Sequence, residues 1–185
     1  MRADFDLENK DGEARTGIVR LATGSFKTPC FMPVGTRGSV RHLSSLDLKD
    51  LGAQVVLANT YHLMLRPGAE IVKNAGGIGS FANWKGLTLT DSGGYQIFSL
   101  APKIDEEGAT FRSVYDGSFH KLTPESSAEI QADIGADIQM VLDICPALPA
   151  PEATIKESVE MTAAWAERGR KTFIDHPDAS SRQSQ

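Results

Sequence analysis

The sequence predicts an α/β fold in which a parallel sheet follows an N-terminal β-hairpin, and three observations support this prediction. Short apolar segments alternate with helix-like segments from residue 28 onward, which is the rhythm of parallel strands joined by right-handed helical crossovers. The apolar segments are continuous, as expected for strands covered on both faces. Ahead of them, two strand-like segments flank an Asp-Gly dipeptide, which is a strong hairpin signal.

The N-terminal part contains the predicted hairpin and the first strand of the sheet. The hairpin comprises residues 5–8 and 15–21, on either side of the Asp-Gly turn. The short apolar run at residues 28–34 is the first predicted strand of the sheet. A helix is expected near residues 44–51, and Gly52 closes it because glycine readily adopts the left-handed conformation that ends helices.

Two further strands are predicted at residues 54–59 and 87–90, with a helical stretch at residues 68–74 between them. The Gly-Gly pair at residues 76 and 77 stops this stretch. Residues 103–120 combine turn signals with spaced aromatic side chains, which indicates an inserted hairpin.

The last predicted elements are a helix, a strand and a long helix. Thr123 caps the first of these helices and Pro124 suits its first position. The fourth strand of the sheet follows at residues 137–142. The long helix opens at Pro151. We expect its apolar stripe to lie in the core, and the stripe comprises Ile155, Val159, Thr162, Ala166 and Phe173.

Four predicted core strands leave two architectures open. A (β/α)8 barrel needs about 250 residues, and a complete flavodoxin-like domain would fit the 185 residues better. However, a polar tail at residues 177–185 stands where a fifth strand is due. We interpret residues 1–185 as a single domain and the tail as a ragged end.

The composition is that of an ordinary globular chain, with 41% hydrophobic and 23% charged residues. No apolar run approaches the roughly 20 residues that span a bilayer, and the acidic start does not resemble a signal peptide. We therefore expect a cytoplasmic protein without membrane contact.

The net charge of −5 argues mildly against nucleic-acid binding, unless a local basic patch or a surface outside this chain provides the phosphate contacts. The cysteines form no Cys-x-x-Cys pair, and we predict no metal site in this chain.

Three predicted strands end on a polar side chain that precedes a turn, namely Asn59, Asp91 and Asp143. In parallel α/β sheets, functional groups gather at the carboxyl ends of the strands. Two carboxylates that meet there can share acid–base and nucleophilic work. The alternative is that each aspartate only caps the turn that follows it.

The segment after the third strand favours a ligand site. Gly93 and Gly94 let the backbone come close to a ligand, and the Ser92 hydroxyl can hydrogen-bond a planar heterocycle or its sugar. Tyr95 offers an aromatic face that can stack on a base. The competing interpretation is an ordinary Gly-Gly turn followed by a core tyrosine.

Five segments together resemble tRNA-guanine transglycosylases (queuine tRNA-ribosyltransferases) in their order and approximate spacing. The most specific one is TDSGGYQIFSL at residues 90–100. The others lie at residues 32–36, 59–68, 122–126 and 137–143, so the resemblance covers nearly the whole chain. One departure is Ile144, where many bacterial members carry a glutamate between the aspartate and the cysteine. Because Ile144 follows Asp143, this difference bears on which base the site accepts.

The resemblance implies that the chain is the N-terminal half of a (β/α)8 TIM barrel with an N-terminal β-hairpin extension. The family exchanges guanine at the tRNA wobble position for a 7-deazaguanine by double displacement, in queuosine biosynthesis. Asp91 is then the acid–base carboxylate, and Asp143 recognises the paired N–H donors of the guanine edge. The residues that would line the base pocket or contact the ribose are Asn59, Ser92, Gly93, Gly94, Tyr95 and Cys145, with Tyr95 stacked on the base and Asn59 bonded to the ribose.

The same resemblance implies that parts of the enzyme lie outside these 185 residues. The nucleophilic aspartate and the ligands of a structural zinc come later in the family, so the chain on its own is expected to need no cofactor and to be inactive. The expected partners of the intact protein are tRNA, guanine or a 7-deazaguanine base, and a second copy in a homodimer. Two alternatives remain: a truncated, non-catalytic chain that binds RNA or a partner subunit, and an unrelated barrel hydrolase that uses Asp91 and Asp143 as a carboxylate pair.

Overall fold

A computed structural model describes residues 3–100 and 102–185, in which the strands form three separate sheets. The first sheet is antiparallel and contains β1 (Asp4–Asp11), β2 (Ala14–Arg20) and β3 (Ser25–Thr28). The second is parallel and contains β4 (Val55–Ala58), β5 (Leu87–Thr90) and β9 (Ile138–Gln139). The third is antiparallel and contains β6 (Lys103–Asp105), β7 (Gly108–Arg112) and β8 (Phe119–Leu122).

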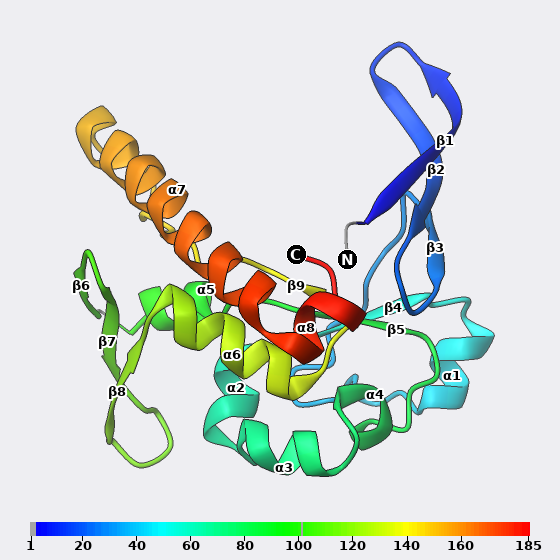
Figure 1. Cartoon of the computed structure of the whole chain (residues 1–185), viewed down its shortest axis with the longest axis horizontal. Coiled ribbons are helices and arrows are strands. Elements are labelled where there is room, and N and C mark those ends of the chain that lie inside the picture. Colours follow the sequence, from blue (N-terminus) through cyan, green and yellow to red (C-terminus); the bar gives the residue numbers. More distant parts are fainter. Residues whose placement is uncertain (1–2, 101) are drawn as a thin grey trace.

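The two antiparallel sheets lie at opposite ends of the long axis, with the parallel sheet between them (Figure 1). The predicted N-terminal hairpin is therefore present as β1 and β2, and β3 extends it. The predicted insertion is also present, although it is a three-stranded sheet rather than a hairpin. The acidic start, which does not resemble a signal peptide, includes Met1 and Arg2, and these two residues lie outside the described part of the chain.

The parallel sheet follows the order of the chain. β5 pairs with β4 on one side and with β9 on the other. Isolated parallel bridges extend the sheet at both edges, from Val34 to Leu57 of β4 and from Ser184 to Ile138 of β9. A flavodoxin-like sheet would place its first strand between the second and the third, and this order is not seen. The sheet does not close into a barrel within the described residues.

The first predicted strand of this sheet, at residues 28–34, is largely wrong. β3 ends at Thr28 and belongs to the antiparallel sheet, and only Val34 pairs with β4. Pro29 and Pro33 explain the difference because a proline has no N–H to donate to a ladder. The carbonyl of Pro33 still accepts a hydrogen bond from the Leu57 N–H (2.9 Å), so the segment reaches β4 without forming a strand.

The fourth predicted strand, at residues 137–142, is reduced to the two residues of β9. The buried side chain of Gln131 accounts for its early end. Its amide oxygen accepts a hydrogen bond from the Met140 N–H (3.0 Å), and its amide nitrogen donates to the Met140 carbonyl (2.9 Å). The Met140 N–H also donates to the Thr90 carbonyl of β5 (3.2 Å), so it is the Met140 carbonyl that the helix side chain diverts from continuing the ladder.

Three predicted helices are present as α1 (Ser45–Asp50), α3 (Ala69–Asn74) and α6 (Pro124–Ile134). Thr123 caps α6 by accepting from the Ser126 N–H, and Gly135 ends it with a φ of 74°. Three short helices between β4 and β6 were not predicted, namely α2 (Thr60–Leu65), α4 (Ile78–Phe81) and α5 (Gly94–Phe98). Each has at most six residues, and none has a side-chain cap at its start.

The long predicted helix is α7 (Glu152–Asp175), but the side chains that it buries differ from the predicted stripe. Phe173 is buried as expected, whereas Ile155 is 39% and Val159 62% exposed. The buried positions are instead Ser158, Trp165, Gly169 and Phe173. The N-terminal turns of α7 project beyond the helix α6 on which its later turns pack (Figure 1), which leaves the early part of the stripe uncovered.

The tail that was expected to be ragged is ordered. Residues Pro177–Arg182 form α8, and Gln183 and Ser184 are buried beside β9. The Gln139 N–H donates to the Ser184 carbonyl (2.8 Å), and the Ser184 N–H donates to the Asp137 carbonyl (2.9 Å). In the described part of the chain, none of the helices is both long and apolar enough to cross a membrane.

Candidate active site

The predicted site residues meet at one edge of the parallel sheet. Asn59 directly follows β4, Asp91 directly follows β5, and Asp143 follows β9 after a short irregular segment. Because the strands are parallel, their carboxyl ends lie at the same edge. The structure thus brings together the three polar strand ends that the sequence singled out.

The Asp91 carboxylate is held by donors from two neighbouring loops. Its Oδ1 accepts from the Thr60 N–H (2.8 Å) and the Gly93 N–H (3.2 Å), and its Oδ2 accepts from the Asn59 amide. The Thr60 hydroxyl also donates to the Asp91 backbone carbonyl (2.6 Å). These contacts fix the orientation of the carboxylate. They use one of the two N–H groups of the Asn59 amide, and the contact of Asn59 with a ribose remains a prediction.

Asp143 is joined to the Asp91 loop through Ser92. The Ser92 hydroxyl donates to Asp143 Oδ1 (3.1 Å), and the Cys145 thiol donates to Asp143 Oδ2 (3.1 Å). Ser92 is itself anchored, because its backbone carbonyl accepts from the Ser127 hydroxyl of α6 (3.0 Å). Both carboxylates therefore belong to one hydrogen-bonded assembly rather than to separate turns.

The two glycines of the motif have different structural requirements. Gly93 has a φ of 83°, a left-handed conformation that other residues rarely adopt. Gly94 has an ordinary φ, but a Cβ at this position would lie 2.9 Å from both the backbone carbonyl and Oδ1 of Asp143. The second glycine is thus required for the close approach of the α5 backbone to Asp143.

Tyr95 and Gln96 follow these glycines on α5. The Tyr95 side chain is 73% exposed, so it is not the core residue of the competing interpretation, and its ring is accessible for stacking. Gln96 received no role from the sequence. Its amide oxygen is buried and has no hydrogen-bond partner among the described residues. The only sequence signal for Gln96 is its position in the motif.

His62 and Cys145 have shifted pKa values. Burial is the main cause that lowers the pKa of His62; the charge of Arg37 lowers it further, and that of Asp91 opposes the shift. Burial, followed by the hydrogen bond and the charge of Asp143, raises the pKa of the Cys145 thiol to about 11. Cys145 is therefore a neutral donor to Asp143 rather than a nucleophile at neutral pH.

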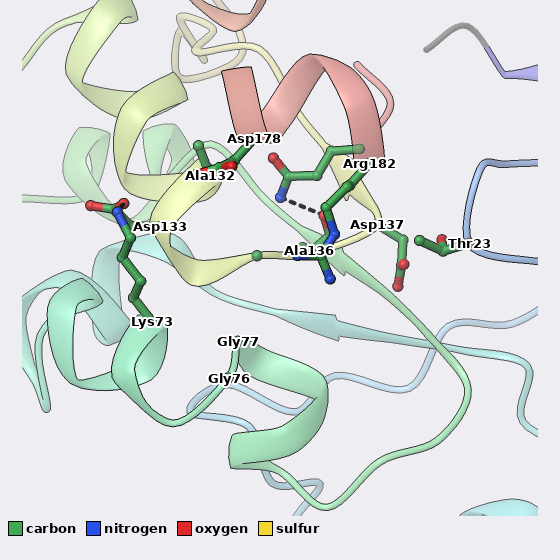
Figure 2. A pocket seen from close by; sticks show the side chains of 12 residues that line it. Thr23, Lys73, Gly76, Gly77, Ala132, Asp133, Ala136, Asp137, Asp178 and Arg182 are labelled. Atoms are coloured by element: carbon green, nitrogen blue, oxygen red, sulfur yellow. Dashed lines mark hydrogen bonds and ion pairs between the residues drawn. The ribbon is translucent and has the colours of Figure 1, made fainter. Parts of the chain in front are cut away.

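A separate pocket of about 260 Å³ lies at the opposite edge of the sheet (Figure 2). It is lined by residues that precede β9, such as Ala136 and Asp137, and by Arg182 of α8. Several of its polar groups are engaged within the fold. Asp137 accepts from the Thr88 N–H (2.7 Å), and Gln183 donates to the Ala136 carbonyl (2.5 Å; dashed in Figure 2). We attribute this edge to stability, as is usual for the amino ends of parallel strands.

Metal binding finds no support in the described part of the chain. No group of three or more His, Cys, Asp or Glu side chains there could hold a metal ion. The arrangement is instead that of an α/β protein whose paired carboxylates and glycine turn stand at the carboxyl edge of a chain-ordered parallel sheet.

Comparison with known proteins assigns the family. The model of the family described as queuine tRNA-ribosyltransferase matches residues 10–184, and the chain belongs to this family. The chain is 50% identical over 178 residues to a queuine tRNA-ribosyltransferase of Cereibacter sphaeroides, which covers 95% of the chain and 47% of the relative. The relative from Caulobacter vibrioides is 51% identical over 172 residues, covering 91% of the chain and 46% of the relative. The chain thus spans about half the length of the curated relatives it matches.

Proposed function

We propose that this chain carries the base-recognition part of a tRNA-guanine transglycosylase site. The intact enzyme would exchange guanine at the tRNA wobble position for a 7-deazaguanine, in queuosine biosynthesis. The observation that carries this proposal is the assembly of Asp91, Ser92 and Asp143 at one sheet edge, in a chain that belongs to the queuine tRNA-ribosyltransferase family.

In this proposal Asp143 recognises the base. The guanine edge presents two adjacent N–H donors, and a carboxylate can accept both in a charge-assisted contact. The Ser92 hydroxyl and the Cys145 thiol donate to the two oxygens of Asp143 and hold the carboxylate in place. The missing Cβ of Gly94 leaves room beside it. Tyr95 stacks on the base with its exposed ring, and Cys145 lines the pocket.

Asp91 acts on protons next to the reacting sugar. In the double displacement, a carboxylate outside this chain attacks the ribose C1′, the C1′–N9 bond breaks, and guanine leaves with a proton that Asp91 donates to N9. The incoming base then attacks C1′ through N9, and the ester to the enzyme breaks. Asp91 takes the proton from this N9. The donors from Thr60 and Gly93 orient the carboxylate for that step, and Asn59 links it to the ribose.

We further propose that the chain is the N-terminal half of a (β/α)8 barrel and one incomplete domain. The chain-ordered parallel sheet supports this, as does the match to about half of each relative. The nucleophile and the ligands of a structural zinc would then lie in the unmatched half. The isolated chain would be inactive, and the intact protein would be a cytoplasmic homodimer that binds tRNA.

A non-catalytic role is the second candidate function. An apolar groove of about 450 Å³ runs between the loop after Asp143 and the exposed stripe of α7, including Val159. Such a groove suits a partner subunit that covers it. This candidate predicts binding of a partner or RNA without base exchange.

Labelled guanine and tRNA test the proposal. The unmatched half of the Cereibacter sphaeroides relative is fused in frame after this chain, and incorporation of label into tRNA is measured. We expect exchange by the fusion, none by the chain alone, and a loss of at least a hundredfold in the fusion with Asp91→Asn, within the usual range for a general acid–base group. Full activity of the Asp91→Asn fusion would refute the role of Asp91. A fusion that folds and binds tRNA without exchange would favour the second candidate.

A further inference from the structure

Four side chains near Asp91 form a cationic and aromatic group that the proposed reaction leaves unused, and we call it the α2 rim: Arg37, His62, Arg66 and Tyr115. The Tyr115 hydroxyl lies 2.9 Å from His62 Nδ1. The guanidinium carbon of Arg66 lies 4.6 Å from the centre of the Tyr115 ring, a cation–π contact. The loop between β7 and β8 therefore holds Arg66 in a defined place at the end of α2.

The α2 rim is connected to the site through the ends of α2. The helix begins at Thr60, which binds Asp91 with its backbone N–H and its hydroxyl. Arg66 ends the helix, about 9 Å further along its axis at 1.5 Å per residue. On the other side, the Asn59 N–H donates to the Thr36 carbonyl (3.2 Å), which places Arg37 next to the site.

The charge of Arg37 lowers the pKa of His62 and that of Asp91 raises it, with burial the largest cause of the net lowering. Arg37 and Arg66 are exposed, and no ion pair involves either of them in the part of the chain that the structure describes. Other cationic side chains in the same part have acidic partners, among them Arg20 with Asp6 and Arg168 with Glu125. Among the described residues, two guanidinium groups without an ion pair are therefore joined to the Asp91 site through Thr36 and α2, in a chain whose net charge is −5.

Guanidinium groups near a reacting sugar fit the phosphates of a nucleic acid. A stacked strand carries one charge per 3.4 Å, so the roughly 9 Å from Thr60 to Arg66 corresponds to about two to three phosphates. The negative charge of Asp91 would repel this strand, and nearby arginines would offset the repulsion. These two arginines thus provide a local basic patch in a chain with a negative net charge.

We propose that Arg37 and Arg66 bind phosphates of the RNA strand near the exchanged nucleotide, with Tyr115 positioning Arg66. That the bound nucleic acid is RNA rests on the proposed function. The assignment of these four side chains is independent of the exchange chemistry, because it concerns binding alone. The chain as it stands can therefore be tested.

The test is the salt dependence of RNA binding. Fluorescence anisotropy measures the affinity of the 185-residue chain for an anticodon stem-loop with guanine at the wobble position, from low to moderate KCl concentration. Each lost phosphate contact with a single strand should reduce the slope of log K against log [KCl] by about 0.7. We expect this reduction for Arg37→Gln and for Arg66→Gln, and about twice as much for the double variant.

Arg15→Gln is the matched control, because Arg15 is also exposed and lies on the distant hairpin. Its slope should equal that of the unchanged chain. Tyr115→Phe keeps the ring under Arg66 and should retain the slope, whereas Tyr115→Leu should lower it as Arg66→Gln does. Far-UV circular dichroism checks that every variant is folded. Equal slopes for Arg37→Gln, Arg66→Gln and Arg15→Gln would overturn the inference, and so would an absence of measurable RNA binding at low salt.

Guanine binding by the same variants separates this inference from the proposed function. If guanine binds in a manner that requires Asp143 while RNA binding ignores Arg37 and Arg66, the inference fails and the proposed function stands. If the α2 rim variants lower the slope but guanine does not bind, the rim is an RNA surface and the base-recognition role of Asp143 fails.

Discussion

At the scale of single residues, the two oxygens of Asp143 have different donors, the Ser92 hydroxyl and the Cys145 thiol. The same carboxylate supplies both the hydrogen bond and the negative charge that, after burial, raise the pKa of Cys145 to about 11. At pH 8 only about one Cys145 side chain in a thousand is then a thiolate, the form that reacts with alkylating agents.

We therefore expect iodoacetamide to modify Cys145 slowly at pH 8, with a rate that rises about tenfold per pH unit toward pH 11. Mass spectrometry of the Cys145 peptide over this pH range measures the rate. Asp143→Asn should increase the rate because it removes the charge that disfavours the thiolate. A rate at pH 8 equal to that in urea-unfolded chain would contradict the raised pKa.

The close approach at Gly94 gives a second residue-scale prediction. In Gly94→Ala the added methyl group would lie 2.9 Å from Asp143 Oδ1, so the carboxylate or the α5 backbone must move. We expect guanine binding to fall at least tenfold and stability to fall by about 1–3 kcal/mol, as for other overpacked positions. Isothermal calorimetry and urea unfolding measure the two effects.

Gly79→Ala is the control for this substitution, because a Cβ there meets only the Trp84 carbonyl at 3.4 Å and the backbone is not strained. Its guanine affinity should be unchanged. If both variants bind guanine equally well, the space beside Gly94 is not part of the base pocket.

At the scale of elements, α6 connects the two loops that carry the site. Its Ser127 anchors Ser92, and its Gln131 binds Met140 and the Thr90 hydroxyl (2.9 Å). Gln131 is fully buried, so these bonds are shielded from water. In Gln131→Leu the backbone groups of Met140 and the Thr90 hydroxyl would lose a partner, and unsatisfied buried groups are costly.

We expect Gln131→Leu to lower the free energy of unfolding by roughly 2–3 kcal/mol, measured by urea denaturation. Glu129→Leu on the exposed side of α6 is the control and should change the stability by less than about 0.5 kcal/mol. Equal effects of the two substitutions would show that Gln131 does not tie α6 to the strands.

Arg168 connects α7 to α6 and to the turn between β6 and β7. It donates to both oxygens of Glu125 (2.7 and 2.8 Å) and to the carbonyl of Glu106 (2.7 Å). The hydrogen bond from Arg168 is the main cause that lowers the pKa of Glu125. Because the folded pKa is depressed, this contribution to stability is present above the unfolded pKa and is lost as the pH falls through the folded one.

We expect Arg168→Gln to cost about 1 kcal/mol at pH 7, since both side chains are more than a third exposed and the pair is screened. The difference from the unchanged chain should shrink below pH 4. Lys156→Gln, in an exposed pair with Glu160, is the control and should cost less. A difference that stays constant from pH 7 to pH 3, measured by thermal unfolding, would exclude the Glu125 contact as its cause.

At the scale of the whole molecule, an apolar groove beside Asp143 is left uncovered. Its α7 wall includes Ile155 and Val159, which the sequence pattern assigned to a core. In the half-barrel proposal, the unmatched part of the relatives would cover this wall and complete the core that the pattern indicates.

We therefore expect this chain to form a 1:1 complex with the separately produced unmatched half of the Cereibacter sphaeroides relative, measured by size-exclusion chromatography with light scattering. Val159→Lys should weaken the complex at least tenfold because it places a charge in the groove. Leu7→Lys, at an exposed apolar position of β1, is the control and should have no effect. Equal complex formation by the two variants would exclude the groove as the contact surface.

Much of the fold could be predicted because local signals agree with it. The caps at Thr123 and Gly135 bound α6 as expected, and the hairpin formed at its Asp-Gly turn. The failed strand at residues 28–34 had a local cause in its two prolines. Other errors depended on groups outside the local pattern. Gln131 diverted the Met140 carbonyl from the ladder at the end of β9, and the absence of a neighbouring element left Val159 exposed.

The sequence by itself determined the family, the alternation of strands and helices, and the polar residues that end the strands, because these depend on motif order and neighbouring residues. Only the tertiary structure decided that the sheet follows chain order, that Ser92 joins the two carboxylate loops, and that Gly94 rather than Gly93 makes the close approach to Asp143. These facts depend on distances between residues far apart in the chain. Such distances are set by how the strands pair and how α6 packs on them.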